Sequence, residues 1–504
     1  MSNRGVPNEK NREFFKTEHL QPNLKRRSIQ GGLITVSSQG VKFALTLISN
    51  ICLARLLTPA DHGLVSMVMA VIGFMKLFKD LGLSMATVQR KEINHAQVST
   101  LFWINLAFSL LIGLITVILA PVIAQFYQEP RLVWITIALA SGIVISGLGT
   151  QHIALLQRQM QYSKLAACEL IAQVCGVGLA IVAALQGMGY WALVIYPIAT
   201  ATTLTLGALL SCGWIPGWPS WDPEIPSMLK FGGNLTGFTV INYCARNVDN
   251  ILIGKYLGKT QLGLYAKAYQ LLLLPIKQIN GPIRSVAIPL LSRLSDSPEK
   301  YRRAYIKIVQ KLMLLTVPLV AFMMATSDWL IAILLGKQWI PATPIFLWLG
   351  LAGAMQPVAN SVGWLLISQG QTDRMLIWGI ISTILAVTSF GIGLPWGATG
   401  VAASYALVWI LITMPLLFWF VGKSGPVRTQ DFYVATAPII LALITTAAAL
   451  LCFRFYFQSP HILLGCLLAG VITISVFIGT LLTFPSGRAI VQDSKDIMKN
   501  FTRT

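Results

Sequence analysis

Charged residues are scarce in this 504-residue sequence, and acidic ones are the scarcest. Charged side chains make up 11% of the chain, with 18 Asp and Glu against 38 Lys and Arg, whereas soluble domains carry about 25%. Hydrophobic residues make up 55%. The longest mainly polar stretches are the first thirty residues and residues 292–311. The shortage excludes a set of soluble domains and indicates that a lipid bilayer is the solvent for most side chains.

Residues that bind metals or form disulfides are also few. The seven cysteines all fall within or beside apolar runs, and none has the spacing of a zinc site or a disulfide framework. No paired carboxylates, no nucleophile with its base and no metal cluster are visible. We therefore expect no catalytic residues, no metal and no cofactor. A cleavable signal peptide is not expected either, because thirty polar residues precede the first apolar run.

Long apolar runs dominate the rest of the chain. A membrane-spanning helix needs about 20 mostly apolar residues, and windows of that length predict about fourteen spans in an all-α, polytopic fold. The predicted spans are residues 33–54, 64–84, 99–120, 132–154, 165–185, 191–213, 229–253, 262–283, 309–335, 343–367, 375–395, 398–421, 433–453 and 462–484. The first and seventh spans are the least apolar, and a stricter threshold would count twelve. Either number is even, which puts both termini on the same side of the membrane.

The distribution of Lys and Arg predicts which side that is. The termini and the even-numbered connections hold 28 of the 38 basic residues, and the odd-numbered connections hold six. Short loops rich in Lys and Arg stay in the cytoplasm, so both termini are expected to be cytoplasmic. Because the positive charge is spread over many short segments, nucleic-acid binding is not expected. The basic tail at Lys25, Arg26 and Arg27 is expected to anchor the chain beside membrane lipids.

The two halves of the chain are related by an offset of 200 residues. Residues 50–64 read NICLARLLTPADHGL and residues 250–264 read NILIGKYLGKTQLGL. Both copies join a relatively polar span to the next span through a short external turn. An offset of six spans preserves orientation and predicts parallel repeats, with a site at the interface between them. The predicted organisation is a basic N-terminal tail, an N-lobe, a C-lobe, two further spans and a C-terminal tail, at residues 1–30, 31–223, 224–422, 423–485 and 486–504.

Polar residues follow one face of the first span and of its counterpart, the seventh. The first span carries Ser38, Lys42, Thr46 and Ser49 at helical spacing, and the seventh carries Asn242, Arg246 and Asp249. Shifted by 200, the second set falls on Lys42, Thr46 and Ser49. Charges at membrane depth are costly and are often functional. These residues predict that both polar faces line a shared cavity inside the protein. The basic groups of this cavity, together with Lys277 on the eighth span, would favour an anionic ligand.

Structural interpretations stand beside this one. Arg246 and Asp249 are spaced to form an intrahelical ion pair. The side chain of Lys42 could instead snorkel, extending along the helix until its ammonium group reaches the membrane surface. Lys79, Asp80 and Lys277 have positions that also suit the cytoplasmic surface. Glu169 and Asp328 are expected to be lone acids, with Asp328 solvated near an external end.

Several stretches resemble the bacterial polysaccharide transporter family, which comprises O-antigen and exopolysaccharide flippases. The resemblance is carried by LARLLTPADHGLVSMVMAVIGFMKLFKDLGLSMATVQR at residues 53–90 and by NVDNILIGKYLGKTQLGLYAKAYQL at residues 247–271. It continues in VAIPLLSRL at residues 286–294 and LLGKQW at residues 334–339. Together the similar stretches cover most of residues 30–420.

This resemblance implies a fold and a function. The fold would have two six-helix lobes around a central cavity plus two extra C-terminal helices, within the superfamily of drug-extrusion transporters and the lipid II flippase. The function would be translocation of undecaprenyl-diphosphate-linked oligosaccharides across the inner membrane by alternating access. Candidate substrate-binding residues are Lys42, Lys79, Asn242, Arg246 and Lys277. Asp249 or Asp80 would carry the coupling ion, H+ or Na+, and polysaccharide export and polymerase proteins are the expected partners.

Three other classes of membrane protein remain alternatives. An ion-coupled drug or toxin antiporter would be expected to have a more acidic, less cationic cavity. A polysaccharide polymerase or ligase would be expected to carry catalytic residues on a large external loop, but every predicted external connection is short. A channel is a third option, and rings of like charge would then imply an oligomer.

Overall fold

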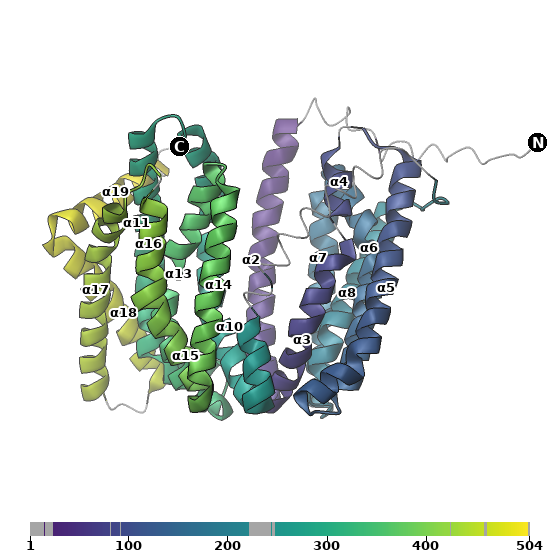
Figure 1. Cartoon of the computed structure of the whole chain (residues 1–504), viewed down its shortest axis with the longest axis horizontal. Helices are drawn as coiled ribbons and strands as arrows, with labels where there is room; N and C mark the ends of the chain where they lie inside the picture. Colours follow the sequence, from purple (N-terminus) through teal and green to yellow (C-terminus); the bar gives the residue numbers. More distant parts are fainter. Residues whose placement is uncertain are drawn as a thin grey trace, which may run out of the picture. The chain divides into compact units, whose positions relative to one another are not determined.

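The computed structural model describes residues 15, 24–80, 82–90, 92–220, 243, 247–423, 425–457 and 461–501. All the regular structure in these residues is helical (Figure 1). Eleven described segments are long and apolar enough to cross a membrane, and one of them, Thr372–Gly422, contains two of the predicted spans. The chain is therefore a multi-pass α-helical membrane protein. Two compact units are present, Met1–Gly263 and Leu264–Thr504.

The first unit is a helical bundle. It contains α2 (Leu24–Leu56), α3 (Pro59–Asp80), the short α4 (Leu83–Gln89), α5 (His95–Tyr127), α6 (Leu132–Arg158), α7 (Tyr162–Leu185), α8 (Trp191–Cys212) and the beginning of α10 (Val248–Arg293). Within it α5 packs on α6, α7 packs on α8, and α6 and α8 join the two pairs. The helix α2 lies against α7, and α3 lies against α5 and α6.

The second unit repeats this pattern of helix pairs. It contains the rest of α10, α11 (Pro298–Ala325), α12 (Ser327–Leu334), α13 (Thr343–Ser368), α14 (Thr372–Gly393), α15 (Gly397–Val408), α16 (Met414–Gly422), α17 (Thr429–Tyr456), α18 (Ile462–Thr483) and α19 (Pro485–Phe501), with short 3-10 and π segments between some of them. Here α11 packs on α13, α14 packs on α15, and α13 packs on α15. The correspondence with α5, α6, α7 and α8 supports the repeat read from the sequence.

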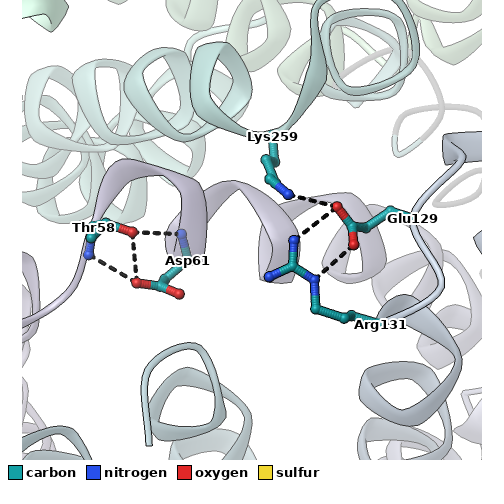
Figure 2. A network of polar contacts seen from close by, with 5 residues as sticks. All are labelled: Thr58, Asp61, Glu129, Arg131 and Lys259. Atoms are coloured by element: carbon teal, nitrogen blue, oxygen red, sulfur yellow. Dashed lines mark hydrogen bonds and ion pairs between the residues drawn. The ribbon is translucent and has the colours of Figure 1, made fainter. Parts of the chain in front are cut away.

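Helix boundaries follow local capping signals. The sequence Thr58-Pro59-Ala60-Asp61 opens α3 with reciprocal bonds: the Thr58 amide donates to the Asp61 carboxylate at 3.0 Å, and the Asp61 amide donates to the Thr58 hydroxyl at 3.2 Å (Figure 2). Proline suits the first helical position because its missing N–H has no partner there. Asn94 and Gln97 form the same kind of box at the start of α5.

The predicted span boundaries differ from the structure at both ends of the chain. Helix α2 begins at Leu24, within the segment that we predicted to be a polar tail, because backbone hydrogen bonds continue where side chains become polar. The C-terminal tail is largely helical, as α19, and buries Ile490 and Val491 in a core with α11 and α17 residues. Most of the predicted seventh span, residues 229–253, lies outside the described residues.

Helix α10 contains a sharp break. Gly258 has φ 80° and ψ 177°, which separates a first part, up to Leu257, from a second part that begins at Lys259. This backbone conformation is essentially confined to glycine. The break coincides with the short turn that the sequence predicts between the seventh and eighth spans. The end of the first unit, Gly263, lies one turn into the second part of α10.

Candidate functional site

The cationic residue of α2 has an acidic partner on α7. Lys42 Nζ forms an ion pair with the Glu169 carboxylate, and the side chains retain 20% and 34% exposure. One turn along both helices, the Gln173 amide donates to Thr46 Oγ1 at 3.3 Å and to Tyr196 Oη at 2.8 Å. The polar stripe of α2 therefore faces α7 at these two levels. The expectation that Glu169 is a lone acid was wrong.

The other predicted basic residues occupy different environments. Lys79, at the end of α3, donates to Ser146 Oγ on α6 at 3.2 Å. Lys277 lies on the second part of α10, in the second unit, and is exposed. Asn242 and Arg246 lie outside the described residues. In the first unit, Lys42 and Lys79 are thus each held by a polar partner.

The two predicted ion-coupling acids are both at helix ends. Asp249 lies in the first turn of α10, is 5% exposed, and accepts a hydrogen bond from the Asn250 amide at 2.8 Å. Acids near a helix N-terminus are stabilised by the helix dipole. Asp80 is the last residue of α3, and its side chain lies outside the described part.

A second charged cluster, which sequence reasoning missed, lies at the turn between α5 and α6. Glu129 accepts hydrogen bonds from Arg131 at 2.7 Å and 3.0 Å and from Lys259 Nζ at 2.7 Å (Figure 2). We call Glu129, Arg131 and Lys259 the carboxylate clamp. Hydrogen bonds from Arg131 first, and from Lys259, lower the pKa of Glu129 to about 2. One signal for this cluster was available in the sequence: Glu129 lies in a short predicted loop, two residues before Arg131.

The same end of the first unit contains a close backbone contact. A Cβ built on Gly63 would overlap the backbone carbonyl of Lys259, and one built on Gly263 would overlap the carbonyl of Pro59. We call these four residues the glycine junction. Small residues let helices approach at backbone distance. The start of α3 and the second part of α10 are therefore in direct backbone contact.

In the second unit, Asp328 was expected to be a lone acid, and this was also wrong, although its side chain keeps 39% exposure. Arg454 on α17 donates to both carboxylate oxygens of Asp328, at 2.6 Å and 2.7 Å, and its guanidinium lies 4.1 Å from the centre of the Trp329 ring. A two-pronged contact of this kind fixes the geometry of both side chains. The pair joins α17 to the start of α12.

Comparison with known proteins supplies the family context. A family model described as "Polysaccharide biosynthesis protein" matches residues 52–344, more than half of the chain. The chain is 27% identical to the teichuronic acid biosynthesis protein TuaB of Bacillus subtilis, over 81% of this chain and 82% of that protein. It is 25% identical to the lipopolysaccharide biosynthesis protein WzxC of Escherichia coli, over 79% and 81%.

Solved structures show the same fold at low identity. A structure of the lipid II flippase MurJ matches with a TM-score of 0.67 and 15% identity, covering 89% of this chain and 99% of that one. An inward-facing multidrug resistance MATE family transporter of the MOP superfamily matches with a TM-score of 0.58 and 17% identity, covering 75% and 93%. The fold is therefore one that transporters use.

Proposed function

The chain belongs to the family of polysaccharide biosynthesis proteins, and from that premise we propose that it is a flippase for lipid-linked oligosaccharides. The observation that carries this proposal is the combination of that family with a fold shared with the lipid II flippase over 89% of the chain. The proposed substrate is an undecaprenyl-diphosphate-linked repeat unit for polysaccharide export. The proposed location is the bacterial inner membrane, with both termini in the cytoplasm, as the Lys and Arg distribution predicts.

The physical task of such a protein is to solvate a sugar head group inside a membrane. Each hydroxyl moved into hydrocarbon without a hydrogen-bond partner costs several kcal/mol, on the order of 4 or more against an alkane-like medium. A polar, hydrated cavity replaces that solvation while the lipid tail stays in the bilayer. We propose that the two repeats expose this cavity alternately to each side, as repeat-built transporters do.

The diphosphate is proposed to bind to four basic side chains and one side-chain amide. Lys42 and Lys79 from the first unit, Lys277 from the second, and Asn242 and Arg246 from the seventh span are the proposed binding residues. Because Lys42 is paired with Glu169, a diphosphate that binds Lys42 must compete with that carboxylate. Its two phosphate groups offer more charge and more acceptor oxygens than one carboxylate. Glu169 would then hold Lys42 in place between transport cycles and keep it from being an unpaired cation.

Coupling to an ion gradient is the remaining part of the proposal. Asp249 is the favoured carrier of H+ or Na+, because it is buried near the start of α10 and its counterpart in the repeat lies on the polar face of α2. Asp80 is the second candidate. Other export and polymerase proteins are proposed partners on the grounds of the family alone.

A binding experiment separates this proposal from its alternatives. The purified protein in nanodiscs is titrated with undecaprenyl-diphosphate oligosaccharide, with undecaprenyl-monophosphate oligosaccharide, and with a lipophilic cationic drug. We expect the diphosphate lipid to bind tightest, and Lys42→Ala and Arg246→Ala to weaken it while insertion and folding are retained. Tightest binding of the drug would favour an antiporter, and lengthening of the glycan during incubation would reveal a polymerase.

A further inference from the structure

The glycine junction has the reciprocal form that a two-fold-related contact requires. Gly63 meets the carbonyl of Lys259, and Gly263 meets the carbonyl of Pro59. Both pairs of positions are related by the 200-residue repeat offset, since 59 corresponds to 259 and 63 to 263. Each repeat thus contributes one glycine and one carbonyl, as in an isologous interface where residue i contacts j and j contacts i.

The carboxylate clamp acts on the same residue as the glycine junction. Lys259 presents its backbone to Gly63 and its side chain to Glu129, so it is held on two sides (Figure 2). One turn earlier, Lys255 Nζ contacts the Phe126 carbonyl and lies 4.8 Å from the centre of the Phe126 ring. Two lysines on either side of the break at Gly258 therefore attach α10 to the end of α5 and to the turn that follows it.

The charges of the clamp make it suited to release. Glu129 is 16% exposed and is bonded to two cations. When Lys259 leaves, Arg131 still neutralises the carboxylate, so release does not strand an unpaired, partly buried acid. When Lys259 returns, no group has to change its protonation state, because the pKa of Glu129 lies far below neutral. An ion pair that can break without a large penalty suits a contact that opens in every cycle.

We infer that Glu129 and Lys259 form a latch that holds the turn between α5 and α6 against the second part of α10, beside the glycine junction with the start of α3, and that this latch must open for the cavity to release its cargo at this end. The inference rests on the proposed function, because it assigns the latch to one step of alternating access. Gly258, directly before Lys259, supplies a backbone joint at which the second part of α10 can reorient. A rigid junction that never opens is the opposing interpretation.

Reversible cross-linking distinguishes the two interpretations. A Glu129→Cys/Lys259→Cys variant is reconstituted in proteoliposomes and treated with a flexible bis-methanethiosulfonate reagent, and movement of the lipid-linked oligosaccharide is measured before and after reduction. The matched control is a Lys307→Cys/Asp493→Cys variant, which replaces a 2.6 Å ion pair between α11 and α19. The latch predicts at least a tenfold loss of movement on cross-linking the first pair, recovery on reduction, and little change in the control.

The outcomes separate the latch from the proposed function. If the reduced and the cross-linked forms of the Glu129→Cys/Lys259→Cys variant move lipid equally fast, the junction is static and the latch is wrong. If the wild-type protein moves no lipid, the proposed function fails, and the latch is then judged by hydrogen exchange alone. In that measurement Glu129→Gln should speed exchange of amides 60–64 and 260–263 severalfold, whereas Glu299→Gln, in an exposed pair with Arg303, should not. Unchanged exchange in Glu129→Gln would overturn the latch, also where the cysteine variants fail to fold.

Discussion

At the residue scale, the informative feature of this protein is that some of its described basic side chains have acidic partners. Lys42 pairs with Glu169, and Lys259 shares Glu129 with Arg131. A lone ammonium at membrane depth is costly, roughly 2.5–3.5 kcal/mol on insertion scales. A partner that a ligand can displace lowers that cost in the empty protein and leaves the cation available. If Lys42 binds an anionic ligand, as we propose, Glu169 competes with that ligand and weakens its binding.

Replacing Glu169 should strengthen the binding of diphosphate. In Glu169→Gln, Lys42 loses its competing anion, and we expect affinity for undecaprenyl diphosphate to rise roughly two- to fivefold, the range that a partly exposed ion pair supports. Isothermal titration of the purified protein measures this. Glu299→Gln makes the same chemical change at an exposed pair and should leave affinity unchanged. Weaker binding in Glu169→Gln would mean that the acid helps to form the site and does not compete for it.

The carboxylate clamp should be insensitive to pH across the physiological range. The pKa of Glu129 is about 2 in the folded protein, against 4.5 for an ordinary Glu. A lowered pKa gives a stabilisation that is complete above about pH 4.5 and is lost as the pH falls through 2. We expect the difference in thermal midpoint between the wild-type protein and Glu129→Gln to stay constant from pH 8 to pH 5. A difference that vanishes between pH 7 and pH 5 would show that another group controls the clamp.

At the scale of elements, the break in α10 is the feature with the clearest energetic consequence. Gly258 adopts φ 80° and ψ 177°, where a Cβ is strained by about 1–3 kcal/mol. Gly258→Ala should lower the unfolding free energy by about that amount and slow any motion that uses the joint. Gly281→Ala is the control, because Gly281 lies in the same helix and a Cβ there meets nothing within 4 Å. Equal denaturation midpoints for the two variants would remove the strain argument.

Most of the helices could be predicted from the sequence, whereas the ion-pair partners of the charged side chains could not. A bilayer forces each crossing to be a long apolar helix, so hydropathy alone placed α5, α6, α7 and α8. The ion pair of Lys42 with Glu169 depends on how α2 and α7 are rotated about their own axes, and packing between residues 127 positions apart decides that rotation. Glu129 escaped notice because an acid in a short loop has no periodicity to mark it. The repeat, by contrast, pairs Gly63 with Gly263 from the sequence alone, and these two positions meet in the structure.

At the scale of the whole molecule, the repeat connects the fold to the proposed transport. The same helix pairs occur in both units, and the two glycines that meet at the junction are the same position of the two repeats. A protein built from two equivalent halves has two similar arrangements available to it, which is the property that alternating access uses. The family and the basic side chains then favour an anionic, lipid-linked glycan as the cargo.

The most direct test of this account is movement of a fluorescent undecaprenyl-diphosphate oligosaccharide between the leaflets of proteoliposomes. The wild-type protein is compared with Arg246→Ala and with empty liposomes, and a membrane-impermeant quencher reports the outer leaflet. The account predicts movement that depends on the protein and is lost in Arg246→Ala. Movement no faster than in empty liposomes, with ion-coupled efflux of small cations instead, would contradict it.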